Sequence, residues 1–578
     1  MAKTPNDHRR KPLRLWPGIA FAALLVGFHL AVPLLGPAGP PLRFLGGLVG
    51  GLLILLWWLF FSRAPWSERI GAIALMAVAM LVTSRFLHIS IGDQGKGPLF
   101  PILAIPATSV ALVAWAVATA RLSDRVRRVS LIATIVAACS AWMLLRIGGF
   151  TGDGGLELHW RWTPSSDYRL QELAAKPGTS APVDRPGVEP VTLAEWPGFR
   201  GPARDGVVRA VTVATNWEAS PPVEMWRRPV GPGWSSFAVH GDRLYTQEQR
   251  GDKEVVASYN LRTGEPIWEH RDAARFWETA GGAGPRGTPT LSNGRVYTFG
   301  ATGILNALDA RSGEVVWSRN TVADTGAQDP GWGFTSSPLV VDDIVIVAAS
   351  GRLAGYAAAT GERRWVGPEG GAGYSSPHLM TIDGVRQVLL MRGARTTSVS
   401  PADGTMLWEH RWVPNASILQ PARTSNGDIL LAAGDAMTGI GMRRIAVKRG
   451  AGEWTIEERW TSRGLKPFYN DFVVHKEHAF GFDGSILACI DLADGSRKWK
   501  GGRYGHGQMV LLPEQDLLLV ISEEGELALV SATPDRFTEV ARFKAIEGKT
   551  WNHPVVVGDK LLVRNGAEAA CYALPIAP

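Results

Sequence analysis

Cysteine is scarce in this 578-residue chain, which contains only Cys139, Cys489 and Cys571. No two of them are adjacent or spaced as a C-x-x-C pair, and no His/Cys spacing typical of zinc ligands accompanies them. Three widely separated thiols do not form a disulfide framework. The sequence therefore excludes both a disulfide-stapled scaffold and a zinc module.

The chain also lacks a strong excess of one charge. Its 60 Lys and Arg residues against 53 Asp and Glu residues give a net charge of +7. Much of this excess lies in short loops between apolar runs, where basic residues orient membrane helices. We therefore expect no nucleic acid partner.

Long apolar runs occur only in the first 150 residues. Five of them approach the roughly 20 residues that a membrane-spanning helix needs. The predicted spans are residues 15–35, 44–61, 70–89, 99–120 and 129–145. None of these spans contains Asp or Glu, so we expect a membrane anchor rather than a proton relay.

Basic residues in the loops between these spans indicate their orientation. They are concentrated in the N-terminal tail, in the second loop with Arg63 and Arg69, and in the fourth loop around Arg125. Loops rich in Lys and Arg face the cytoplasm. We therefore expect a cytoplasmic N-terminus, and five spans would place everything after Arg146 on the opposite side.

Composition changes after the membrane domain, which we place at residues 1–150. Residues 151–195 are rich in Pro, Gly and charge without periodicity, as is typical of a semi-extended linker. Residues 196–578 are mixed in polarity and rich in Gly and Trp. We expect this last region to be one further domain.

A recurring motif organises residues 196–578. Five copies end in a Gly followed four residues later by a Trp: YNLRTGEPIW, LDARSGEVVW, YAAATGERRW, VSPADGTMLW and IDLADGSRKW. Similar strands around Trp226, Trp460 and Phe543 complete a period of about 40–50 residues, which is typical of a β-propeller with one four-stranded blade per repeat. We predict eight blades, the eighth combining the C-terminal strands with the early strand around Trp226. Each Gly would supply the turn, and each Trp would pack between blades.

Polar residues precede the first strand of every predicted blade and so should ring the channel mouth. They are Ser235, Ser236, Arg286, Thr288, Ser336, Ser337, Ser375, Ser376, Gln420, Asn470, Asp471, His506, Gln508, Asn552 and His553. Convergent polar groups in a concave site indicate a binding pocket, although Ser and Thr here can also serve the backbone alone. Arg286 and Asp471 could neutralise each other across the channel. Trp234, Trp332 and Trp551 near the same rim could stack on a planar ligand.

The repeats resemble those of the pyrroloquinoline-quinone (PQQ)-like propeller family, and WPGFRGPARDG at residues 196–206 resembles an opening segment of that group. Five membrane spans before an eight-bladed propeller also resemble the layout of membrane-bound quinoprotein glucose dehydrogenases. That resemblance implies PQQ, Ca²⁺ and electron transfer to a quinone. The same repeat also builds a non-catalytic outer-membrane assembly lipoprotein.

Two hypotheses follow. In the first, the chain is a bacterial inner-membrane protein with a periplasmic propeller that binds a small ligand or a protein partner at its channel mouth. In the second, it is a PQQ-dependent dehydrogenase of sugars or alcohols. Asp471 would then be the general base and a Ca²⁺ ligand. The expected cofactor-binding residues are Arg286, Trp332, Asn470, His506, Trp551, Asn552 and His553. Short loops and few carboxylates favour the first hypothesis, whereas the layout favours the second.

Overall fold

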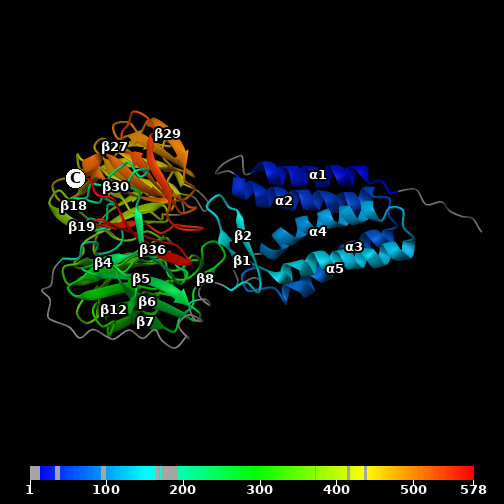
Figure 1. The fold of residues 1–578 in the computed structure, drawn as a ribbon, viewed down its shortest axis with the longest axis horizontal. Helices are drawn as coiled ribbons and strands as arrows, with labels where there is room; N and C mark the ends of the chain where they lie inside the picture. The colour runs from blue at the N-terminus through cyan, green and yellow to red at the C-terminus, as the bar shows by residue number, and fades with distance from the viewer. Residues whose placement is uncertain are drawn as a thin grey trace, which may run out of the picture. The chain divides into compact units, whose positions relative to one another are not determined.

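The computed structural model describes residues 13–32, 39–92, 99–164, 166, 170, 193–371, 373–412, 417–434 and 439–577. The chain forms two compact units, Met1–Thr163 and Pro164–Pro578. The first is helical and the second consists of β-sheets (Figure 1).

Helices that lie side by side build the first unit. They are α1 (Trp16–Ala31), α2 (Gly39–Leu56), which continues as a π-helical turn η2 (Trp57–Phe61), α3 (Trp66–Ser84), α4 (Leu99–Ala118) and α5 (Asp124–Ser140), which ends in a 3₁₀ turn η3 (Ala141–Leu144). Helix α2 packs between α1 and α4, while α5 packs against both α3 and α4 (Figure 1).

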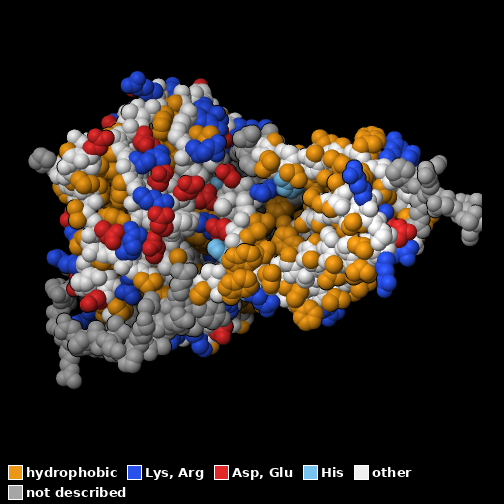
Figure 2. Space-filling model, turned by 45° about the vertical axis from the view of Figure 1, so that its right-hand side comes forward, with side chains coloured by type: hydrophobic (Ala, Val, Ile, Leu, Met, Phe, Trp, Pro, Cys, Tyr) orange, Lys and Arg blue, Asp and Glu red, His pale blue; other side chains and the backbone are white. Residues whose placement is uncertain are grey.

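Four helical segments in the described residues are long and apolar enough to cross a membrane: Leu42–Phe61, Trp66–Ser84, Leu99–Ala118 and Asp124–Leu144. The prediction of five spans is therefore corrected to four, because α1 is apolar but has only 16 residues. At about 1.5 Å per residue, that helix is shorter than a bilayer core of about 30 Å. Apolar side chains cover much of the visible helical surface (Figure 2).

Glycines on α2 allow its neighbours to approach closely. A Cβ added at Gly46 would lie 2.1 Å from the Phe28 ring of α1, and one at Gly51 would lie 3.3 Å from the Pro106 backbone of α4. Small residues permit such backbone approach between membrane helices. The two faces of α2 are thus shaped for α1 and α4.

Among the described residues of the helical unit, one acidic side chain is buried. Helix α3 begins four residues before the predicted span and therefore includes Glu68. This residue is only 5% exposed. Its Oε2 lies 3.3 Å from Arg127 Nη2 on α5. The span formed by this helix therefore contains an acidic residue, contrary to the prediction from the sequence. The Glu68 carboxylate is paired with Arg127, a basic residue of the fourth loop region.

A two-stranded hairpin follows the helices. Strands β1 (Leu145–Phe150) and β2 (Leu156–Trp160) pair in antiparallel fashion. Ile147 is buried, and its amide donates to Ser90 Oγ at 2.9 Å. The sequence did not predict this hairpin, and part of it occupies the beginning of the expected linker.

Eight antiparallel sheets of four strands form the second unit, as the sequence predicted. Blade 1 contains β4 (Ala238–His240), β5 (Arg243–Arg250), β6 (Lys253–Asn260) and β7 (Pro266–Asp272); blade 2 contains β10 (Thr290–Ser292), β11 (Arg295–Phe299), β12 (Ile304–Asp309) and β13 (Val315–Asn320); blade 3 contains β14 (Leu339–Val341), β15 (Ile344–Ala349), β16 (Arg352–Ala357) and β17 (Arg363–Val366); blade 4 contains β18 (His378–Ile382), β19 (Val385–Arg392), β20 (Arg395–Val399) and β21 (Met406–Arg411).

The remaining blades continue the pattern. Blade 5 contains β22 (Ala422–Arg423), β23 (Ile429–Gly434), β24 (Gly439–Arg449) and β25 (Trp454–Ser462); blade 6 contains β26 (Phe472–His475), β27 (His478–Asp483), β28 (Ile486–Asp491) and β29 (Arg497–Arg503); blade 7 contains β30 (Gln508–Leu512), β31 (Leu517–Ile521), β32 (Glu526–Ser531) and β33 (Glu539–Lys544). Smaller elements join them: the pair β8 (Trp277–Glu278) and β9 (Gly282–Ala283), the short helix α7 (Thr321–Thr325) and the 3₁₀ turn η4 (Pro513–Gln515).

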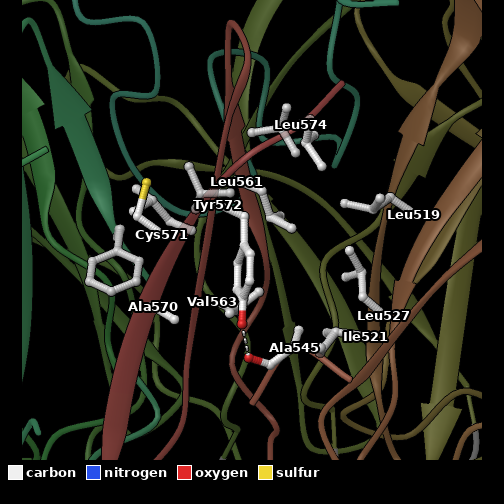
Figure 3. Close-up of a cluster of buried hydrophobic side chains, with 14 of the residues drawn as sticks. Leu519, Ile521, Leu527, Ala545, Leu561, Val563, Ala570, Cys571, Tyr572 and Leu574 are labelled. Atoms are coloured by element: carbon white, nitrogen blue, oxygen red, sulfur yellow. Dashed lines mark hydrogen bonds between the residues drawn. The ribbon is translucent and has the colours of Figure 1, made fainter. Parts of the chain in front are cut away.

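Blade 8 joins the two ends of the propeller sequence. Strands β34 (Val555–Val557), β35 (Lys560–Arg564) and β36 (Glu568–Ala573) are completed by β3 (Val223–Pro229), which pairs with β36. This confirms the predicted closure, which leaves no unfinished blade with exposed edges. Side chains of blade 8, including Leu561 and Val563, face Leu519 and Leu527 of blade 7 in one apolar cluster (Figure 3).

The motif Trp of one blade fastens it to the next blade. A Cβ added at Gly313 would lie only 2.5 Å from the Trp268 ring. Trp268 Nε1 donates to the Ala310 carbonyl at 3.1 Å. The same contact recurs between four further blade pairs: Trp226 with Gly264, Trp317 with Gly361, Trp365 with Gly404 and Trp460 with Gly495. The Gly therefore supplies both a positive φ and the space for the neighbouring indole.

Trp408 of blade 4 departs from this pattern. Its Nε1 donates to Gln387 Oε1 of its own blade at 2.6 Å. Blade 5 has no Gly four residues before its Trp460, so it offers no matching turn. A side chain within blade 4 satisfies the indole instead.

Candidate functional site

The segments that precede the inner strands are linked in a ring around the channel. The Ser236 amide donates to Thr288 Oγ1 at 3.0 Å, and the Thr288 amide donates to Ser337 Oγ at 2.9 Å. The Ser337 amide then donates to Ser376 Oγ at 2.9 Å. These hydroxyls fasten one blade to the next, which is the structural role that Ser and Thr often have at such positions.

Amide side chains continue this ring through blades 6, 7, 8 and 1. Gln508 accepts from the Asp471 amide at 3.1 Å and donates to the Trp551 carbonyl at 3.1 Å. Asn552 donates to the Ser235 carbonyl at 2.7 Å. Asn470 instead serves its own blade, because it accepts from the Phe468 amide and donates to the Gly484 carbonyl.

A plug segment, residues 196–211, crosses the channel below this ring. Its first residues bond to inner strands of blades 1 and 2, where Trp196 pairs with Val239 and the Leu291 amide donates to the Pro197 carbonyl. Its later residues bond to blade 7, where the Leu511 amide donates to the Gly206 carbonyl. Blades 2 and 7 are three positions apart in the eight-bladed ring, and two arginines of the segment reach further blades.

Arg200 and Arg204 of the plug segment extend their side chains to blades that are three positions apart in the ring. Arg200 donates to the Phe472 carbonyl of blade 6 at 2.8 Å, and Arg204 donates to the Pro338 carbonyl of blade 3 at 2.9 Å. Both are non-glycine residues with positive φ, 62° and 54°. Backbone strain of this kind persists only where the surroundings enforce it.

Asp471 is fully occupied by two partners at the centre of the channel. Its Oδ2 lies 2.5 Å from Arg200 Nε and 3.0 Å from His553 Nε2, and its side chain is 2% exposed. Its Oδ1 accepts from the Phe472 amide at 2.7 Å. Burial alone would raise the pKa of Asp471, but the charge of Arg200 and the hydrogen bond from His553 hold it below its usual value.

Arg286 does not face Asp471. Its Nη2 lies 3.0 Å from Glu278 Oε1, and both side chains are buried. Burial lowers the pKa of Arg286, and the nearby charge of Glu278 opposes that shift. The expected neutralisation across the channel is therefore replaced by two separate pairs, Arg286 with Glu278 and Arg200 with Asp471.

Six aromatic residues form a continuous group at the channel mouth, which we call the mouth cluster. Its ring-centroid distances are 4.7 Å for Trp234–Trp551, 4.9 Å for Trp551–Tyr469, 5.5 Å for Tyr469–Phe468, 6.3 Å for Phe468–Trp332 and 4.6 Å for Trp332–Tyr374. Phe468 precedes blade 6 and Trp332 precedes blade 3, which are not neighbours. The cluster therefore spans the mouth rather than lining one side.

Charged groups border the mouth cluster. Lys549 Nζ lies 4.7 Å from the Trp551 ring centroid and 5.5 Å from that of Trp234, within cation–π range. Trp551 Nε1 donates to Glu523 Oε1 at 2.9 Å, and the His506 ring stacks on Tyr469 at 5.2 Å. Apart from Phe468, the rings of the cluster are only partly buried, so their outer faces are available to a ligand.

The donor set of the channel does not fit the Ca²⁺ that the family resemblance implies beside PQQ. Ca²⁺ takes six to eight oxygen ligands, usually with several carboxylates. Within the described part of the chain, no three His, Cys, Asp or Glu side chains are grouped to hold a metal ion. Asp471, the carboxylate at that depth, is bound by the Arg200 cation, which competes directly with a metal.

Several site residues were missed by sequence reasoning. Arg200, Arg204 and Tyr469 carry no repeat signal, and the blade carbonyls that the two arginines reach are 133 or more residues away in the sequence. The R-G-P-A-R spacing of the opening motif was the available signal for Arg200 and Arg204.

A family comparison matches two overlapping stretches, residues 204–372 and 252–501, to the family described as outer membrane protein assembly factor BamB. Together they span just over half of the chain. The outer membrane protein assembly factor BamB of Shewanella oneidensis is 23% identical over 385 residues, covering 61% of this chain and 89% of that protein.

Two further proteins show similarity. The quinohemoprotein alcohol dehydrogenase ADH-IIG of Pseudomonas putida is 31% identical over 125 residues, covering 20% of this chain and 17% of that protein. Among solved structures, BamB from Moraxella catarrhalis matches with a TM-score of 0.44 and 15% identity, covering 61% of this chain and all of that one.

Proposed function

This chain belongs to the family described as outer membrane protein assembly factor BamB, and on that premise we propose that it is a membrane-anchored propeller that binds a protein partner at its mouth cluster. The propeller would act as a scaffold and not as a catalyst. Its helices would hold the scaffold at the membrane, since four of them have the length and hydropathy of a span.

The mouth cluster is the observation that carries this proposal. Partly exposed Trp and Tyr side chains contribute most to protein–protein binding, because they bury much area with few rotatable bonds. Here five such rings adjoin one another, and the channel behind them holds the buried Arg200–Asp471–His553 group. A partner would therefore bind across the mouth and not inside the channel.

Photo-crosslinking tests the position of the partner. A photoreactive residue is placed at Trp234 in the full-length chain expressed in its own bacterium, with Met406, 50% exposed on β21, as the matched control site. We expect one discrete protein adduct from Trp234 and none from Met406. Equal labelling at both sites, or no adduct at Trp234, Trp332 and Tyr374, would refute binding at the mouth.

A PQQ-dependent dehydrogenase is the second candidate, and the stretch shared with the quinohemoprotein alcohol dehydrogenase favours it. Asp471 would be its base, with Arg286, Trp332, Asn470, His506, Trp551, Asn552 and His553 around the cofactor. The test adds PQQ and Ca²⁺ to the purified chain and measures binding and dye reduction with sugars or alcohols. We expect neither, because Arg200 and His553 already bind Asp471. Tight PQQ binding with activity lost in Asp471→Ala would establish the enzyme instead.

The proposed location is the bacterial inner membrane with a periplasmic propeller, and the proposed cytoplasmic N-terminus requires the 16-residue α1 to cross as well, because the four longer spans alone would leave both ends on one side. The basic loops around Arg63 and Arg125 support this orientation. Single cysteines at Arg63 and at Arg311 of the propeller would report it, since the three native cysteines are buried. We expect an impermeant maleimide to label Arg311→Cys in intact spheroplasts and Arg63→Cys only after lysis.

A further inference from the structure

Arg204 is a buried cation that lies 5.9 Å from the Phe199 ring centroid and has no acidic partner in the described part of the chain. Its guanidinium donates to the carbonyls of Pro338 and Ser337 at 2.9 and 3.2 Å, and the residue is 8% exposed. Among the described residues, no Asp or Glu forms an ion pair with it, whereas its neighbour Arg200 is paired with Asp471. Buried charges in proteins are normally paired, because desolvation of a lone ion is costly.

The surroundings of Arg204 add positive charge to this part of the channel. Burial and then the nearby Arg200 cation lower the pKa of Arg204 to about 9, which still leaves it charged at neutral pH. Asp471 offsets only one of the two guanidiniums. The centre of the channel therefore carries at least one positive charge in excess.

Unused hydrogen-bonding atoms occur on Arg204, which contacts blade 3, and at the entries to the two following blades. Arg204 Nε, His378 Nδ1 and Gln420 Oε1 are buried without a partner in the described part of the chain. Gln420 Nε2 reaches the Pro377 carbonyl at 3.3 Å, so it lies beside His378. Burial, followed by the charges of Arg204 and Arg200, lowers the pKa of His378 to about 3, so this imidazole is neutral and one of its nitrogens carries a donor N–H.

We propose that Arg204 binds a small monovalent anion of halide size in the channel, with His378 as a second donor. The anion would supply the counter-charge that the protein does not provide. A small ion suits the site because the plug segment crosses the channel and the mouth cluster spans its opening. This site is separate from the partner surface and does not depend on the proposed function.

Halide-dependent stability tests the site. The full-length chain in detergent is melted in sodium gluconate and in rising chloride or bromide at constant ionic strength, with tryptophan fluorescence as the readout. We expect Tm to rise with halide and to saturate, which a general salt effect does not do. Arg204→Gln should remove this dependence, and its Tm in gluconate should equal or exceed that of the wild type.

The matched control is Arg209→Gln. Arg209 belongs to the same segment but is exposed and paired with Asp205, so this variant should keep the full halide response. If Arg204→Gln does not fold, bromide anomalous diffraction from the wild-type protein gives the answer. A bromide peak beside the Arg204 guanidinium supports the site. No peak there, or an equal halide response in the wild type and Arg204→Gln, overturns it.

Discussion

Asp471 shows how one side chain can organise the centre of a propeller. Its carboxylate joins Arg200 of the plug segment to His553 of blade 8, and its own backbone belongs to blade 6. An ion pair buried to this degree contributes little when intact but is costly to break, since the remaining partner is left as a lone buried charge. Asp471 is therefore expected to be critical for stability whatever it does in binding.

Replacing Asp471 by Asn should destabilise the propeller by about 3–5 kcal/mol, because Arg200 would lose its counter-charge. Chemical denaturation at pH 7 measures the loss in free energy of unfolding. Asp205→Asn, at an exposed pair with Arg209, should cost less than about 1 kcal/mol. Similar losses in the two variants would contradict the importance of the buried pair.

The pH dependence of the same variant provides an independent check. The folded pKa of Asp471 is lowered, so its stabilisation is present above the unfolded value of about 3.9 and is lost as pH falls through the lower folded pKa. The difference in unfolding free energy between wild type and Asp471→Asn should therefore shrink below about pH 4. A difference that stays constant down to pH 2 would show that the carboxylate is not held ionised.

At the scale of the blade, the contact between an indole and the next blade's glycine is the repeating unit of cohesion. Five of the Trp residues fill the space above a turn Gly of the next blade and donate to a carbonyl near that turn, as Trp317 does to Ala358 at 2.9 Å. The motif thus encodes a bond between blades as well as a turn within one. The sequence predicted the Gly turn and the packing of Trp between blades, but not that these Trp residues contact the Gly of the following repeat.

Gly313→Ala should lower the free energy of unfolding by more than the strain of placing Ala at a positive φ alone would cost. A residue with a Cβ at φ +74° costs about 1 kcal/mol, and the 2.5 Å approach to the Trp268 ring adds about 1–3 kcal/mol of overpacking. Gly294, at φ +72° in the same blade, has nothing within 4 Å of its added Cβ. Gly294→Ala should therefore cost only about 1 kcal/mol. Equal losses of stability for the two variants in thermal unfolding would show that the Trp268 ring moves away from the added methyl group at no energetic cost.

For the whole molecule, the periodic spacing of Gly and Trp predicted far more of the fold than the amino-acid composition did. The spacing of Gly and Trp gave eight blades and the pairing of β3 with β36, because each repeat builds the same local unit. The channel centre was not predictable in this way. Arg200 reaches Phe472 across 272 positions, and no local pattern links residues so distant. The hairpin β1–β2 was missed because its strands are short and follow an apolar run.

Ring closure can be tested by a disulfide across blade 8. Arg227 and Ala570 are directly opposed in the β3–β36 pairing, so Arg227→Cys with Ala570→Cys should form a cross-strand bond on oxidation. Because the bond closes a very long loop, it should stabilise by up to about 5 kcal/mol, seen as a higher Tm without reductant. Arg228→Cys with Ala570→Cys is the control, since adjacent strand residues point to opposite faces. Oxidation of the control alone would show that the register is wrong.

The pairing of β3 with β36 also sets an order of events during synthesis. Strand β3 leaves the ribosome before all eight blades' other strands, yet its partner β36 follows the seven other blades in the chain. Domains fold progressively while the chain is being produced, and contacts between distant segments form late. Seven blades can assemble as they emerge, but β3 must wait unpaired until β36 has been made. An arrested or prematurely terminated chain therefore exposes a strand with unpaired backbone groups. We expect such a chain to be among the first states that chaperones and proteases recognise.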